Sequence, residues 1–143
     1  MPGALETCIS EVVAVVRGVS GIQNVPLNPP SVMSYSTFGL VYPSSGTFGI
    51  GPIGTRRGLH SVAIDILTKD VDIARSMATL KPMVDSLANA LIAEVSIGGD
   101  QFNNSIETFG SLTYNWIPLT DYGGVPVVGW HFLMNDVKIL VNL

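Results

Sequence analysis

Hydrophobic residues recur at helical spacing near the start of the chain. The apolar side chains there stand three or four positions apart, which places them on one face of a helix: Leu5, Ile9, Val12, Val13 and Val16. Pro2 suits an opening turn, and Gly18 suits a C-terminal cap directly after Arg17. The pattern therefore predicts a helix from about Pro2 to Arg17.

A longer stripe, again with steps of three and four, predicts a second helix that begins near Asp70. Asp70 is expected to cap the exposed amides, and Asp72 adds negative charge where the helix dipole favours it. Pro82 removes an internal hydrogen bond, so we expect a kink or restart there. The apolar members of the stripe are Ile73, Met77, Leu80, Val84, Leu87 and Leu91.

Strand-like stretches fill much of the remaining chain. Pro43 and Pro118 are expected to end the first and third of them, and Pro126 with Gly129 marks an edge or bulge near the start of the fourth. Alternation of apolar and polar positions is clearest in the second strand. The four expected strands are Phe38–Tyr42, Leu59–Leu67, Ser105–Trp116 and Val125–Leu140.

The order of these elements is helix, strand, strand, helix, strand, strand. Short connections and two consecutive strand pairs favour an α+β domain: a mainly antiparallel four-stranded sheet with two helices packed on one face. The chain shows no internal repeat and no dividing linker, so residues 1–143 are expected to form one domain.

A long hairpin arm is predicted between Pro43 and Gly58. Loops of this length in a compact domain are usually functional or disordered. This one carries apolar side chains that are costly to leave in water, and its base carries the only adjacent basic pair in the chain. We therefore expect an arm that contacts a neighbouring subunit. The expected interface residues are Phe48, Ile50, Ile53, Arg56 and Arg57.

Composition narrows the class of protein. The chain has 143 residues, 47% of them hydrophobic, and a net charge of −4, which excludes a disordered chain. The single cysteine, Cys8, excludes a disulfide framework, and no apolar run approaches the ~20 residues of a membrane span. Glu6 and Glu11 precede the first basic residue, Arg17, so no secretory leader is predicted and a reducing cytoplasm is expected.

Charge is unusually sparse, since only 13% of residues are charged against about 25% in ordinary globular proteins. Large subunit interfaces are depleted in charged residues, so the shortage favours a homo-oligomer over a monomer with a neutral Gly- and Ser-rich surface. The acidic balance argues against tight nucleic-acid binding.

Catalytic and cofactor signals are weak. Gly49, Gly51 and Gly54 match a dinucleotide pattern, but Pro52 lies inside it and a strand rather than a helix is expected to follow, so no cofactor is predicted. The two histidines, with Cys8, supply too few ligands for a zinc site, and no metal is predicted.

Nucleophilic catalysis has little support either. His60 and Asp65 are expected on opposite faces of one strand. A Ser-His-Asp triad stays open, but no Gly-x-Ser-x-Gly elbow is present, and no enzyme is predicted. The aromatic residues near the C-terminal strands are expected to anchor a core or an interface: Tyr114, Trp116, Tyr122 and Trp130.

The order of elements along the whole chain forms a distinct layout. A short helix leads into a proline-rich segment, Pro26–Pro30, and a strand that ends in Val41-Tyr42-Pro43. A Gly-rich hairpin, the strand Leu59–Leu67, the helix from Asp70 and the strand Phe109–Tyr114 follow. This layout resembles the tail-terminator proteins of tailed bacteriophages, a family of small α+β domains at the neck.

The resemblance implies a virion protein that forms a hexameric ring on the head-proximal end of the tail tube. Such a ring stops addition of tube subunits and offers a docking surface to the head connector or head-closure protein. In contractile tails it also meets the tail sheath. DNA would pass through the ring without specific binding, and no membrane is involved. The arm that begins at Pro43 matches the position of the loop that such rings use for contacts.

Two alternatives stay open. The chain could be another neck or tail component, a head-closure or tail-tube subunit, of which the tube subunit would polymerise into long tubes. A small ligand-binding or enzymatic domain that uses the Gly-rich loop would instead be a monomer or dimer with a saturable ligand.

Overall fold

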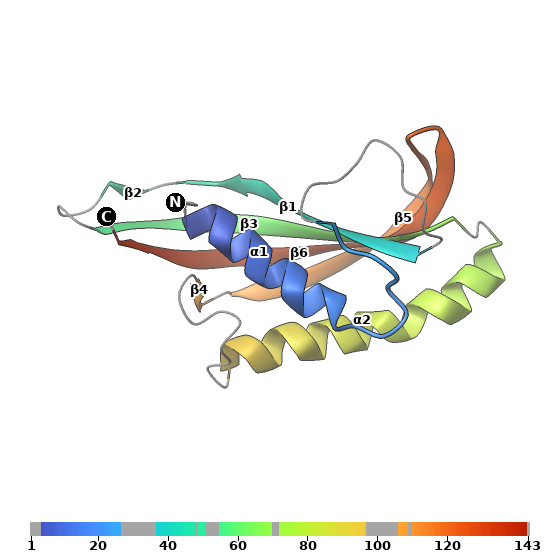
Figure 1. Cartoon of the computed structure of the whole chain (residues 1–143), viewed down its shortest axis with the longest axis horizontal. Coiled ribbons are helices and arrows are strands. Elements are labelled where there is room, and N and C mark those ends of the chain that lie inside the picture. Colours follow the sequence, from blue (N-terminus) through green and yellow to red (C-terminus); the bar gives the residue numbers. More distant parts are fainter. Residues whose placement is uncertain are drawn as a thin grey trace.

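The computed structural model describes residues 4–26, 37–47, 49–50, 55–69, 72–96, 106–108 and 110–142. It is an α+β domain, as predicted, in which two helices accompany an antiparallel sheet (Figure 1). Four long strands and two short ones form the described sheet. The elements are α1 (Ala4–Arg17), β1 (Thr37–Gly46), β2 (Gly49–Ile50), β3 (Thr55–Thr68), α2 (Ile73–Ser96), β4 (Ile106–Thr108), β5 (Ser111–Tyr122) and β6 (Val125–Asn142).

Strands β3 and β6 form the centre of the sheet. β1 and the short β2 pair with the outer side of β3, while β5 and the short β4 pair with β6. One register row crosses all four long strands: Val41 lies opposite Ile64, Ile64 opposite Phe132, and Phe132 opposite Tyr114. β1 and β5 are therefore the long border strands of the described sheet.

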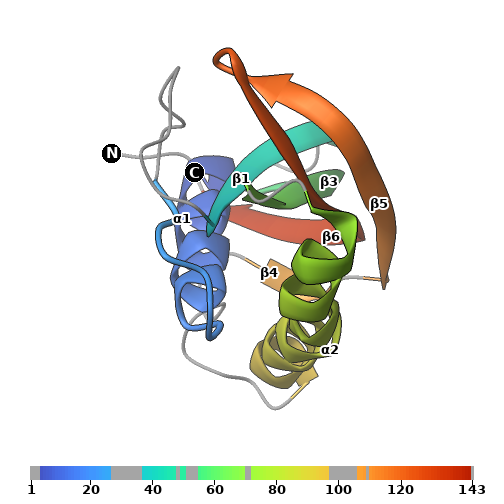
Figure 2. The same cartoon turned by 90° about the vertical axis from the view of Figure 1, so that its right-hand side faces the viewer.

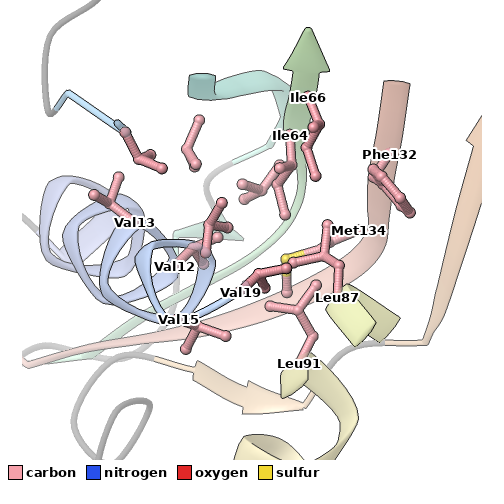
Figure 3. Packing of buried hydrophobic residues seen from close by; sticks show 14 of the residues in the cluster. Val12, Val13, Val15, Val19, Ile64, Ile66, Leu87, Leu91, Phe132 and Met134 are labelled. Carbon is pink, nitrogen blue, oxygen red and sulfur yellow. The ribbon is translucent and has the colours of Figure 1, made fainter. Parts of the chain in front are cut away.

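The main core lies between the two helices and one face of the sheet. Side chains alternate along a strand, so every second residue of β3 and β6 meets the helices. α1 contributes valines and α2 contributes leucines (Figure 3). Fully burying one such side chain stabilises the fold by roughly 1.5–3 kcal/mol. Fully covered members include Val12, Val13, Val16, Ile64, Ile66, Leu80, Leu87, Leu91, Phe132 and Met134.

A second, smaller core lies on the sheet face that turns away from the helices. It contains no helix residue; Phe38 and Leu40 of β1, Leu67 of β3 and Val127 of β6 are its buried members. The end of the β5–β6 hairpin rises over this face (Figure 2). The two-residue turn at Gly123 and Gly124, with φ of 59° and 83°, closes that hairpin with the twist such turns require.

The strand ends differ from those predicted at prolines. β1 does not stop at Pro43 but runs to Gly46, and β5 does not stop at Pro118 but runs to Tyr122. In each strand the register shifts beside the proline, between Pro43 and Ser45 or between Ile117 and Thr120. A bulge on a border strand tolerates the missing N–H, because that side needs no ladder partner.

The N-cap of α2 also differs from the expectation, whereas the end of α1 agrees with it. α1 ends at Arg17, and the amide of Gly18 directly after it donates to the Val15 carbonyl at 3.1 Å. α2 begins at Ile73, and Oδ1 of Asp72 accepts a hydrogen bond from the Arg75 amide at 3.1 Å. Asp72 is therefore the N-cap. Asp70, the predicted cap, lies outside the described residues.

Pro82 does not restart α2, which continues from Ile73 to Ser96 as one helix. The proline lies on the exposed side of the helix, where solvent can satisfy the carbonyl that it leaves without an amide partner. The Ser86 hydroxyl donates to the Pro82 carbonyl at 3.1 Å. The sequence predicted a kink or restart because it does not show that Pro82 is exposed to solvent.

The predicted hairpin arm lies partly outside the described residues, which omit Phe48 and 51–54. The described part is sheet rather than loop. Gly46 pairs with His60, and Ile50 pairs with Arg56. On its other side, β3 remains paired with β6 as far as Thr55 and Asn142. The base of the expected arm is therefore a three-stranded extension of the main sheet, and a projecting arm stays a prediction.

Candidate functional site

A polar cluster joins three strands on the face that turns away from the helices. Asp65 of β3 lies at its centre, and its two carboxylate oxygens bind different partners. The Tyr42 hydroxyl, from β1, donates to Oδ2 at 2.8 Å. The Nδ1 atom of His131, from β6, lies 2.5 Å from Oδ1. We call Tyr42, Asp65 and His131 the polar cluster.

The register explains why these residues meet. Leu40, Asp65, His131 and Asn115 occupy one row across four strands, and Tyr42 is two positions from Leu40 on the same face. The Asp65 side chain is 15% exposed and the His131 side chain 33%. A carboxylate this well covered needs such partners, because an unpaired buried charge is costly.

Burial is the main cause that raises the pKa of Tyr42 above its ordinary value. The hydrogen bond to Asp65 and the negative charge of that carboxylate raise it further. Tyr42 therefore stays protonated and acts as a donor to Asp65 throughout the neutral range.

The polar cluster has part of the geometry of a general base. Asp65 holds Nδ1 of His131, so the ring presents Nε2 to any further group. A nucleophilic triad would need a Ser or Cys at that nitrogen. The residue opposite His131 on β5 is Asn115, which is no nucleophile. The arrangement links β1, β3 and β6.

The sequence pattern did not reveal this cluster. His60 and Asp65 lie on opposite faces of β3, as the sequence predicts, and His60 is buried beside Val62, at a register shift. Burial lowers the pKa of His60. His131 comes from a strand far along the chain, so only the β3–β6 register brings it to Asp65.

An aromatic cluster lies near the β5 border of the sheet, where β5 pairs with β6. The rings of Trp116 and Trp130 meet edge to face with centroids 5.1 Å apart, and Tyr114 meets Trp130 at 5.5 Å. Trp130 Nε1 donates to the Leu80 carbonyl of α2 at 3.2 Å, which fixes the cluster against the helix. Tyr122 does not belong to it and instead packs on Phe38, with centroids 5.4 Å apart.

The strand that carries this cluster is poorly covered. No residue of β5 is buried, whereas the first five of β1 are. Tyr114 is 54% exposed and Leu119 64%. Tyrosine and tryptophan dominate binding hot spots because they offer large apolar area with a polar group. These aromatics therefore differ in exposure: Trp130 packs against the main core, whereas Tyr114, whose ring contacts Trp130 and Phe132, remains exposed. An interface role for Tyr114 stays a prediction.

The five predicted interface residues are only partly placed. Phe48 and Ile53 lie outside the described residues. Ile50 belongs to β2 and lies opposite Arg56, while Arg57 lies opposite Gly49 on one side and Leu140 of β6 on the other. The backbone thus brings Ile50, Arg56 and Arg57 to one end of the sheet. Their role as interface residues stays a prediction.

The Gly-rich segment is followed by strand β3, so the described chain after it does not offer the helix N-terminus that a dinucleotide pyrophosphate needs. Among the described residues, no group of three His, Cys, Asp or Glu side chains could hold a metal ion. Burial raises the pKa of the fully covered Cys8 thiol to about 12, which makes it a poor nucleophile or ligand.

No protein-family model matches the chain, and no curated protein matches it significantly. Within the described residues, neither helix is both long and apolar enough to cross a membrane.

Proposed function

We propose that this chain is a structural virion protein, a tail-terminator subunit whose ring ends the tail tube of a tailed bacteriophage. The ring would have six subunits, stop tube polymerisation and offer the docking surface for the head connector or head-closure protein. It would work in the virion neck after assembly in the host cytoplasm, meet the sheath in a contractile tail, and let DNA pass without specific binding. No catalytic step or cofactor is proposed.

One observation carries this proposal. The long elements α1, β1, β3, α2, β5 and β6 follow the order on which the resemblance to tail terminators rests, and the short strands β2 and β4 are additional to it. Each pairing of the long strands is antiparallel, and both helices pack on one face. The low charge content and the exposed aromatic border add support, because large interfaces are poor in Lys, Asp and Glu and rich in Tyr and Trp.

The polar cluster links three strands, because Asp65 accepts a hydrogen bond from Tyr42 and contacts His131. The ligand-binding alternative makes a different prediction from ring assembly. A binding domain that used the Gly-rich loop would show a saturable ligand, which substitutions in that loop would abolish without affecting assembly.

The test is the mass of the purified protein by light scattering after size exclusion, followed by negative-stain imaging with and without tail tubes. A closed ring of about six subunits, or capping of tube ends by a smaller species, supports the proposal. Open-ended tubes would identify a tube subunit instead. A monomer that also ignores tail tubes would contradict the proposal and favour the ligand-binding alternative.

A further inference from the structure

Strand β5 is the long open border of the described sheet. It pairs with β6 on one side, and within the residues that the structure describes no strand pairs with its other side. Figure 2 shows β5 along one border of the molecule. An open strand edge exposes a row of backbone donors and acceptors that can pair with another chain.

The opposite border is covered where it begins. The segment before β1 runs beside it: the Gln23 amide donates to the Thr37 carbonyl at 3.0 Å, and the Gly39 amide donates to the Asn24 carbonyl at 2.8 Å. Only Leu40 to Tyr42 then remain before the bulge at Pro43. β1 therefore offers a much shorter free edge than β5.

The pairing-competent part of β5 is Ser111–Ile117. It ends where the register shifts after Ile117 and Pro118 removes a backbone donor. These seven residues are longer than a typical strand of five to six. They carry no charged side chain, although monomeric proteins commonly protect such edges with lysine or other charges.

We propose that β5 pairs with β5 of a second copy of this chain, antiparallel, across a two-fold axis at Tyr114. Among the described strands β5 is the long open edge, so an identical edge is the partner that the chain itself supplies. The absence of charge in Ser111–Ile117 is what allows self-pairing, because a charged strand would place like charges opposite each other.

Tyr114 is the middle residue of the pairing-competent segment. An axis there pairs all seven residues, whereas an axis nearer Ile117 would bring Pro118 into the ladder. The two Tyr114 rings then meet at the axis, and each Leu112 lies opposite Trp116 of the partner copy. Thr113 lies opposite Asn115 on the other face. The sheet and both helix layers continue from one copy into the next.

This pairing goes beyond the proposed function and does not depend on it. In a ring with six-fold symmetry alone, no two-fold axis relates adjacent subunits, so β5 pairing would join two rings, or two free subunits, rather than neighbours within one ring.

The decisive experiment is disulfide trapping with Tyr114→Cys in the full chain. Residues opposite each other at an antiparallel two-fold axis have Cα atoms within disulfide reach. Leu119→Cys is the matched control, since it is more exposed and lies on the same strand beyond Pro118. The wild type provides a second control, because its single cysteine, Cys8, is buried.

We expect mild oxidation to convert most of the Tyr114→Cys protein, and little of the Leu119→Cys protein, into a covalent dimer on a non-reducing gel. Equal trapping of both, or of neither, would overturn the proposal. If the Tyr114→Cys protein forms a ring that caps tail tubes but does not crosslink, β5 pairing is overturned and the tail-terminator proposal still stands.

Sedimentation equilibrium provides an independent measurement. Tyr114→Lys places two like charges at the axis and should weaken dimerisation by about tenfold or more. Leu119→Lys should leave the dimerisation constant unchanged. Wild-type protein that remains monomeric at loading concentrations on the order of 100 μM, well above the micromolar range of ordinary specific complexes, would exclude the pairing. Two lysine variants that behave alike would exclude it as well.

Discussion

Single residues of this protein act on more than one strand at a time, and Asp65 is the clearest example. Its two oxygens bind Tyr42 and His131, so one carboxylate connects three neighbouring strands. Hydrogen bonds to a charged group contribute about 1.5–3 kcal/mol each, more than neutral ones. The polar cluster therefore stabilises the sheet in addition to its apolar cores.

Tyr42→Phe should change the response of the fold to alkaline pH. Because the pKa of Tyr42 is raised in the fold, its contribution is fully present below the unfolded-state value of about 10 and is lost as the pH rises above it. The variant should be less stable than wild type by about 1.5–3 kcal/mol at pH 7 but lose less stability between about pH 9 and 11. Urea unfolding at several pH values measures both. Identical slopes for wild type and Tyr42→Phe would contradict the prediction.

Gly129 is required by the close approach of β6 to β3. A Cβ atom at this position would lie 1.8 Å from the Ile66 carbonyl oxygen, which is backbone and cannot rotate away. Gly129→Ala should therefore destabilise the fold by about 3 kcal/mol, at the upper end of overpacking costs. Gly124→Ala is a comparison in which a Cβ meets no atom, although its positive φ of 83° adds some strain. Thermal unfolding of both variants tests the difference, and equal melting temperatures would count against a close approach.

At the scale of elements, local hydrophobic periodicity was sufficient to predict the helices but not where the strands end. The apolar stripe of α2 predicts its buried face because Leu80, Leu87 and Leu91 lie on one side by geometry alone. The strands extend past Pro43 and Pro118 because both prolines lie at bulges on border strands. Whether a strand lies at the border depends on how the whole sheet is assembled. The sequence around a proline therefore does not show whether its strand is a border strand.

The polar cluster was missed for the same physical reason. Asp65 and His131 meet only once β3 and β6 are in register, and no spacing rule connects residues on different strands. The aromatic residues were predicted as anchors because their size and placement on the last strands suffice for that inference. The fold class thus followed from patterns within elements, whereas the site required contacts between them.

Pro82→Ala should stabilise α2. The helix is continuous through Pro82 and the residue is exposed, so alanine restores an internal hydrogen bond without disturbing the core. The intrinsic preference of about 3 kcal/mol for alanine over proline in a helix interior is an upper limit, and we expect a gain of about 1–2 kcal/mol in the free energy of unfolding. Lys81→Ala, at an adjacent exposed position, should change it by less than about 0.5 kcal/mol. Unchanged stability in Pro82→Ala would indicate that the helix is bent around the proline.

At the scale of the whole molecule, two ends of one sheet have separate predicted roles. β2 and the beginning of β3 bring Ile50, Arg56 and Arg57 together at one end, while β5 exposes Tyr114 along a border. Ring assembly through the Ile50, Arg56 and Arg57 end and self-pairing through β5 would use different surfaces. Substitutions at one surface should therefore leave the function of the other unchanged.

Ile50→Asp, and the charge reversal Arg56→Glu with Arg57→Glu, should weaken ring assembly or tube capping by about tenfold. A new charge at an apolar interface costs at least the roughly 1.4 kcal/mol that this factor represents. Light scattering and capping of tail tubes provide the measurement, with Lys81→Glu on the exposed side of α2 as the control. Assembly that is unaffected by both changes would remove this end of the sheet from the interface.

The central ladder of the sheet also determines when the protein can fold. β3 pairs with β1, which precedes it in the chain, but its longest ladder is with β6, the last described strand. This ladder runs from the pair Thr68 and Val128 to the pair Thr55 and Asn142. Closing so long a loop costs entropy before any contact repays it, and such topologies fold slowly. A growing chain on the ribosome would hold β1, β3 and both helices while the strand that completes their core had not yet emerged. The core of this protein is therefore expected to form only after β6 has left the ribosome.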